Sequence, residues 1–180
     1  MKPGLIVIFD RLAAPKPAHF EWRLHSPTEM KVDGQGDIRV VNRKAACRVA
    51  FLAPANLKLS VTDKFDPPPR PRIKLVEWHL TAQTPKPAER MAFVAVIHPH
   101  RVGQEPPAAP KLHKLANGYA LEAPLADGRA VVLLRTADQG KLRFGDLNAD
   151  ADLAAVRFDK AGKPLYRLSA TGRAVQASDL

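Results

Sequence analysis

The segment AHFEWRLH at residues 18–25 decides the expected fold, because its apolar and polar side chains alternate one by one. Phe20, Trp22 and Leu24 fall on one side of an extended chain, and the polar residues between them fall on the other. An α-helix would scatter the same residues around its axis. We therefore predict a strand with one face in a core and one face in solvent.

Strand patterns of this kind recur along the chain, separated by Pro, Gly or Asn residues. Continuous apolar runs at residues 5–9 and 91–98 predict strands that are buried on both faces. Asn117-Gly118 lies between two further strand patterns and predicts a hairpin. No stretch is convincingly an amphipathic helix. We expect an all-β fold with little helix, either an antiparallel β-sandwich or stacked antiparallel sheets, in a single domain spanning residues 1–180.

Two proline-rich segments, residues 66–72 and 99–110, are expected to be loops because proline has no backbone donor for a ladder. The buried strand expected at residues 5–9 begins almost at the first residue. We therefore expect either that the chain is the C-terminal part of a longer multidomain protein or that this strand is inserted into a core. The chain has no signal-peptide pattern and no apolar run near the roughly 18 residues that a bilayer span needs, so no membrane partner is expected.

The charge balance is strongly basic, with 28 Lys and Arg residues against 18 Asp and Glu residues and a net charge of +10. Such a charge attracts polyanions, although solubility alone also accounts for it. Aromatic residues make up only 6% of the chain and do not interleave with basic ones, so no nucleic-acid partner is expected. The one cysteine, Cys47, excludes an internal disulfide, and its alternating strand predicts a buried structural thiol.

Histidines are the residues with the most chemical interest, because none of the common nucleophile, phosphate-loop or zinc-protease motifs is present. His98 and His100 flank Pro99, which is expected to interrupt the strand and leave both histidines at a rim. His25 and His79 belong to two similar strings, EWRLH at residues 21–25 and EWHL at residues 77–80. If both strings lie in one sheet, their polar residues share one face.

That polar face has two interpretations, a plain solvated face or the wall of a binding groove or domain interface. On the second interpretation the candidate substrate-binding residues are Arg23, His25, Arg70, Arg72 and His79. Guanidinium groups suit carboxylate and sulfate as well as phosphate. No catalytic residue and no metal ligand is assigned. A third hypothesis is acid–base catalysis by the two histidines with a neighbouring glutamate from either string.

Four strings also carry a family resemblance: GLIVIFDRL at 4–12, FEWRLHS at 20–26, VEWHL at 76–80 and FVAVI at 93–97. Together they resemble the C-terminal β-region of heparinase II/III-like polysaccharide lyases, over roughly residues 4–170. The resemblance implies a partner domain, an N-terminal α/α toroid that packs on stacked antiparallel sheets. It also implies β-elimination from a uronate-containing polysaccharide and a periplasmic or secreted parent protein.

In that family most of the catalytic machinery lies in the toroid and in an early β segment with a metal-binding histidine motif. No catalytic residue or metal ligand is carried over to this chain, and no cofactor is expected in it. His25 matches the family's strand histidine. We therefore expect an accessory β-domain of a polysaccharide lyase that contributes one wall of a cleft for acidic polysaccharide. The alternative is an autonomous carbohydrate-binding β-sandwich for anionic glycans.

Overall fold

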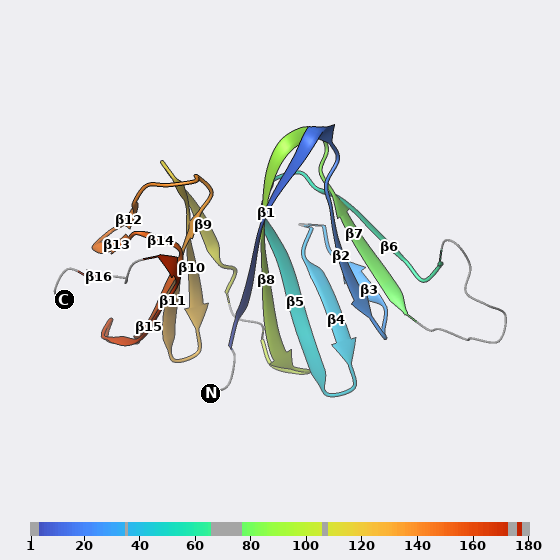
Figure 1. Cartoon of the computed structure of the whole chain (residues 1–180). Helices are drawn as coiled ribbons and strands as arrows, with labels where there is room; N and C mark the ends of the chain where they lie inside the picture. Colours follow the sequence, from blue (N-terminus) through green and yellow to red (C-terminus); the bar gives the residue numbers. More distant parts are fainter. Residues whose placement is uncertain (1–3, 35, 66–76, 106–107, 173–175, 178–180) are drawn as a thin grey trace. The chain divides into compact units, whose positions relative to one another are not determined.

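The computed structural model describes residues 4–34, 36–65, 77–105, 108–172 and 176–177. Within these ranges the regular structure is entirely strand, and every strand pair is antiparallel (Figure 1). This confirms the all-β prediction. Where a single domain was expected, the chain separates into two compact units, Met1–Pro106 and Pro107–Leu180, and the boundary falls inside the proline-rich segment 99–110. Alternating patterns indicate strands but not which strands share a core.

The first unit contains two sheets. One is five-stranded and the other is three-stranded, and neighbouring strands in each are hydrogen-bonded. The five-stranded sheet has the order β1 (Ile6–Ala18), β8 (Ala88–Arg101), β5 (Ala45–Ala53), β4 (Ile38–Asn42) and β3 (Met30–Val32). The three-stranded sheet has the order β2 (Glu21–Ser26), β7 (Trp78–Gln83) and β6 (Lys58–Thr62).

A hydrophobic core joins the two sheets of the first unit, which makes this unit a sandwich. Met30, Ile38 and Val49 come from the five-stranded sheet and Leu80 comes from the three-stranded one, and all four side chains are buried. Leu24 packs against the same core from β2. The alternation of apolar residues in residues 18–25 therefore has the predicted cause, a strand with one face in a core.

Strand β1 differs from the prediction for residues 5–9. It was expected to be buried on both faces, but it pairs only with β8 and forms the edge of its sheet. Ile6 has 44% of its surface exposed. A run of apolar residues predicts a strand, but it does not tell whether that strand lies at the edge or in the middle of its sheet.

Strand β8 confirms one prediction and corrects another. It is the central strand expected at residues 91–98, with its run Phe93–Val96 buried. However, it continues through Pro99 to Arg101 and pairs Pro99 with Cys47, so the expected loop begins later than residue 99. The pairing of β8 with β1 ends at Ile97. At Pro99 no β1 residue therefore needs a backbone N–H from β8, and a proline is tolerated there.

The second unit also contains two sheets. Its five-stranded sheet has the order β15 (Pro164–Gly172), β14 (Ala151–Asp159), β11 (Gly128–Arg135), β10 (Gly118–Leu125) and β9 (Lys111–Leu115). The small sheet has the order β12 (Leu142–Phe144), β13 (Leu147–Ala149) and β16 (Gln176–Ala177). A buried cluster joins them, with Leu133 and Val156 from the large sheet and Leu142 and Leu147 from the small one.

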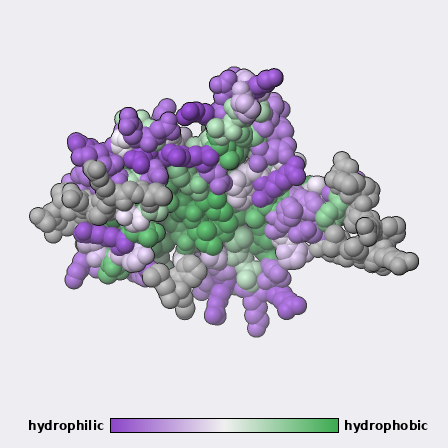
Figure 2. Space-filling view, viewed as in Figure 1, coloured by the Kyte–Doolittle hydropathy of each residue, from purple (hydrophilic) through white to green (hydrophobic). Residues whose placement is uncertain are grey.

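The hairpin predicted at Asn117-Gly118 connects β9 to β10. A Cβ atom at Gly118 would lie 1.9 Å from the carbonyl oxygen of Leu134 on β11, so no larger residue fits without moving backbone. The glycine thus permits the close approach of β11. Hydrophilic residues cover much of the surface visible in Figure 2, as the charged composition predicts. A helix long and apolar enough to cross a bilayer does not occur in the described residues.

Candidate functional site

The candidate site lies on the polar face of the three-stranded sheet in the first unit. Strands β2 and β7 are neighbours, and their register places His25 directly opposite His79 and Arg23 opposite Thr81. Trp78 and Leu80 point to the core from the other face of β7. The prediction that the polar residues of the two strings share one face is therefore confirmed.

The two histidines form a stacked pair. Their ring centroids are 4.6 Å apart and their planes are inclined by 15°. Directly opposite residues in an antiparallel pair have Cβ atoms about 4.5–5.5 Å apart, which is the spacing that this stack requires. The rings of Phe65 and His79 are nearly perpendicular, at 87°, and their centroids are 4.5 Å apart. The His25 side chain is 51% exposed whereas that of His79 is 19% exposed, so the pair has one open and one sheltered member.

The Glu77 carboxylate lies beside both rings of the stack. Its Oε1 is 3.4 Å from Nδ1 of His25, and its Oε2 is 3.7 Å from Nε2 of His79. Both separations exceed the roughly 2.7–2.9 Å of a charge-assisted hydrogen bond. In the part of the chain that the structure describes, Nε2 of His79 is buried and has no hydrogen-bond partner. A buried nitrogen without a partner is costly, which makes this atom a candidate for binding something else.

Arg23 and Glu21 form a separate pair on the same face. Glu21 accepts hydrogen bonds from Nε and Nη2 of Arg23, at 3.2 and 2.7 Å, and one from the side chain of Gln83. The bonds from Arg23 hold the pKa of Glu21 below its usual value. Arg23 is therefore exposed but engaged, and binding a polyanion there would compete with Glu21.

The other predicted site residues have different outcomes. Arg70 and Arg72 lie outside the described residues. Glu77 was recognised as part of the polar face but was not chosen as a site residue. It has the same parity as His79 two positions later, and this shared parity was the signal that could have selected it.

His98 corrects the expectation of a rim position. Its side chain is only 1% exposed, and its Nε2 has no hydrogen-bond partner among the described residues. Burial, then the charges of Arg48 and His100, lower the pKa of His98. All three influences disfavour the charged form of this imidazole. His98 lies inside a strand and not at its end, because β8 continues past Pro99, which was expected to end it.

Cys47 is a free thiol that packs against the core, as predicted, but it is half-buried where a buried residue was expected. Burial raises the pKa of Cys47, which lowers the fraction of reactive thiolate. The residue therefore has no sign of activation as a nucleophile.

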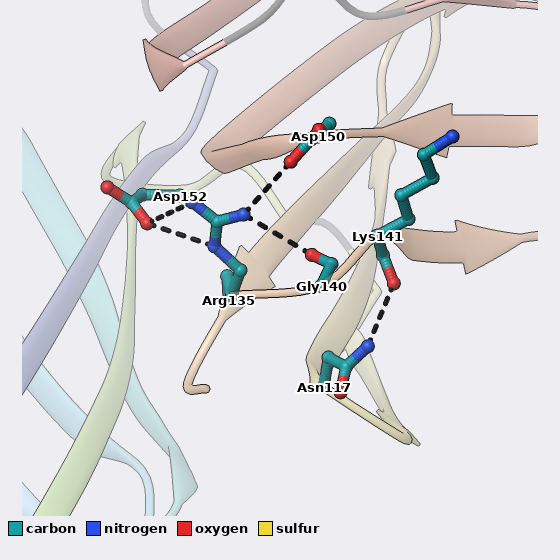
Figure 3. A network of polar contacts seen from close by, with 6 residues as sticks. All are labelled: Asn117, Arg135, Gly140, Lys141, Asp150 and Asp152. Carbon is teal, nitrogen blue, oxygen red and sulfur yellow. Dashed lines mark hydrogen bonds and ion pairs between the residues drawn. The ribbon is translucent and has the colours of Figure 1, made fainter. Parts of the chain in front are cut away.

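A polar network in the second unit has the character of a structural clamp (Figure 3). Arg135 donates to Asp152 at 2.8 and 3.0 Å, to Asp150 at 3.2 Å and to the carbonyl of Gly140 at 3.3 Å. The bonds to Asp152 are the main reason that the pKa of Arg135 is raised. The guanidinium ties the loop after β11 to the start of β14, so its hydrogen bonds are used for the fold.

Neither a scan against protein-family models nor a search of curated proteins finds a match to this chain. The resemblance to heparinase II/III-like lyases therefore stays a prediction. What the site offers chemically is two imidazoles and a carboxylate within reach of one another, beside an exposed guanidinium.

Proposed function

We propose that this chain is a non-catalytic binding module for anionic polysaccharide, the accessory β-part of a heparinase II/III-like lyase. In such a protein an N-terminal α/α toroid would carry out β-elimination on a uronate-containing polymer. The observation that supports the proposal is the polar face on which Arg23, His25 and His79 lie together. Imidazole and guanidinium groups bind carboxylate and sulfate, and a net charge of +10 concentrates a polyanion near them.

The binding mode follows from where the tryptophans lie. Trp22 packs edge-to-face on Phe51 at 5.1 Å and donates from Nε1 to Asp10 at 3.1 Å. Trp78 packs against the core. Neither ring lies on the polar face as a platform for a sugar, so recognition relies on charge and hydrogen bonds.

The test is retention of the whole chain on immobilised heparin and alginate at low and high salt. Replacing Arg23 by Gln is expected to weaken binding roughly two- to fivefold, the size of an exposed ion pair. The matched control is Arg143→Gln, which removes the same charge from an exposed position on β12. If both variants weakened binding equally, net charge alone would explain the binding, and a specific site on this face would be excluded.

The non-catalytic part of the proposal has its own assay. The chain alone should release no unsaturated uronate product from either polymer, measured by the ultraviolet absorbance of that product. Steady turnover that is lost in His25→Ala would instead favour the acid–base hypothesis for this face.

The second candidate is an autonomous carbohydrate-binding module. The first unit closes its own core between two sheets, which favours folding and binding without another domain. Measured affinity of this chain alone, equal to that of a longer protein containing a toroid, would favour this candidate over the accessory one.

A further inference from the structure

We propose that His25, Glu77 and His79 form a binding site for a divalent transition-metal ion of the zinc class. One ligand atom from each residue, an imidazole nitrogen or a carboxylate oxygen, lies within 4.8 Å of the other two. Two histidines and one glutamate are a ligand set that zinc uses when it keeps a fourth position open. The inference is independent of polysaccharide binding, because it concerns the ion alone.

The distances are close to those that a bound ion would impose. Bonds of about 2.0–2.2 Å place neighbouring ligands of a tetrahedral zinc ion about 3.3–3.5 Å apart. The distance from His25 Nδ1 to Glu77 Oε1 is 3.4 Å, and the distance from His79 Nε2 to Glu77 Oε2 is 3.7 Å. The two distances run to different oxygens of Glu77, so side chains must rotate to bring the three ligands to one ion.

The buried nitrogen of His79 gives the second reason. In the described part of the chain it lacks a hydrogen-bond partner, although its neighbour Glu77 is close. A metal ion would satisfy that lone pair and would also balance the carboxylate charge. The hard cations calcium and magnesium prefer all-oxygen sites, so a set with two nitrogens selects the zinc class.

The backbone is well placed to hold the ligands. His25 and His79 occupy paired positions on neighbouring strands, so the register of the sheet sets their spacing. Glu77 directly precedes β7 and shares the parity of His79. Phe65 packs against the ring of His79 in a T-shaped contact.

Binding must open the imidazole stack. The lone pair of an imidazole nitrogen lies in the ring plane, and two planes inclined by only 15° do not converge on one nearby point. We therefore expect at least one ring to rotate when the ion binds. His25 is the more exposed member and has the more freedom to do so.

The experiment is a zinc titration of the metal-free full chain, followed by calorimetry and by competition with a chromogenic chelator. We expect one zinc ion per chain and no comparable binding of magnesium. Cobalt(II) should give the strong visible absorption of a tetrahedral site. Imidazole NMR signals of His25 and His79 should shift together as zinc is added.

The variants are His25→Ala, His79→Ala and Glu77→Gln. Each should weaken zinc binding by at least about tenfold, because even changing a group that only hydrogen-bonds to a metal ligand lowers the affinity by about that much. Glu77→Gln keeps the size of the side chain, so it remains informative if His79→Ala fails to fold. The control is His113→Ala, which removes a histidine paired with Glu122 in the second unit and should leave binding unchanged.

Two outcomes would overturn the proposal. One is wild-type binding no tighter than that of the triple variant H25A/E77Q/H79A. The other is zinc binding that survives all three single changes, which would place the ion on other histidines. Zinc binding without glycan retention would leave this site intact while removing the proposed function.

Discussion

Each unit contains a histidine–glutamate pair beside a phenylalanine, and the two pairs are built differently. In the second unit, Nε2 of His113 is 3.0 Å from Glu122, whose other oxygen accepts a hydrogen bond from Arg129 at 3.1 Å. In the first unit, Glu77 faces two imidazoles at 3.4 and 3.7 Å. The Glu122 carboxylate is neutralised by a guanidinium, whereas within the described residues the Glu77 carboxylate forms ion pairs with imidazoles alone.

The comparison teaches that residue types alone do not make a site. Glu122 has a close partner for each carboxylate oxygen, so its hydrogen bonds stabilise the sheet on which it lies. The cluster around Glu77 has longer contacts and a buried nitrogen without a partner in the described residues. The cluster in the first unit can therefore still bind a ligand, whereas the pair in the second unit is engaged in contacts that stabilise the fold.

The largest effect is expected from the hydrophobic core of each unit. Leu80 is 0% exposed and lies between His79 and Thr81 on β7. Leu80→Ala should lower the free energy of unfolding by about 2–5 kcal/mol through lost burial and a cavity. Leu133→Ala on β11 should cost a similar amount in the second unit.

Denaturant unfolding followed by NMR of assigned amides in each unit measures both effects. Each variant should loosen its own unit first. A loss below about 1 kcal/mol for Leu80→Ala would mean that the sheet carrying the histidines is not held by this core.

A smaller effect is expected at the hairpin that leads from His113 to Glu122. In Gly118→Ala the new methyl group would meet the Leu134 carbonyl, so the backbone must shift. The expected loss is about 1–3 kcal/mol in the free energy of unfolding, as for overpacked sites. Gly34→Ala is the control, because no atom lies within 4 Å of a Cβ there and no positive φ is involved. Equal stabilities of the two variants would contradict the close approach.

Replacing each glutamate by glutamine should change stability differently in the two pairs. Glu122→Gln should cost up to about 1 kcal/mol of unfolding free energy, since it weakens two partly exposed ion pairs. Glu77→Gln in metal-free protein should change stability by less, because its contacts are longer. Thermal unfolding of both variants, with and without zinc, provides the measurement. Equal losses without zinc would remove the contrast between the pairs.

The smallest effect at neutral pH, and a distinct one in acid, is expected for His98. Its pKa in the folded state is lowered, so below the usual imidazole value of about 6.5 the unfolded chain binds more protons than the folded one. The contribution of His98 to stability is therefore complete above that pH and is lost as the pH falls toward the lowered value. Comparing the pH dependence of unfolding for His98→Leu and the wild type tests this. Parallel curves from pH 7 to pH 5 would show that the imidazole titrates normally.

Much of the local structure could be predicted from residue order. The alternation around Trp22, the central strand with Phe93, and the hairpin at Gly118 were all expected and all occur. These predictions worked because a strand has a period of two and turns need particular backbone angles, both of which are local properties. The edge position of β1 and the strand through Pro99 could not be predicted, because they depend on which strands are neighbours.

For the site, residue order was enough to predict that His25 and His79 each lie on the polar side of a strand whose other side is apolar. The fold alone shows that these strands are adjacent, that their register sets one histidine opposite the other, and that the Glu77 carboxylate lies beside both rings. The physical reason is that the side-chain period along one strand is set by its own backbone. The pairing of strands more than fifty residues apart is set by the packing of the whole core.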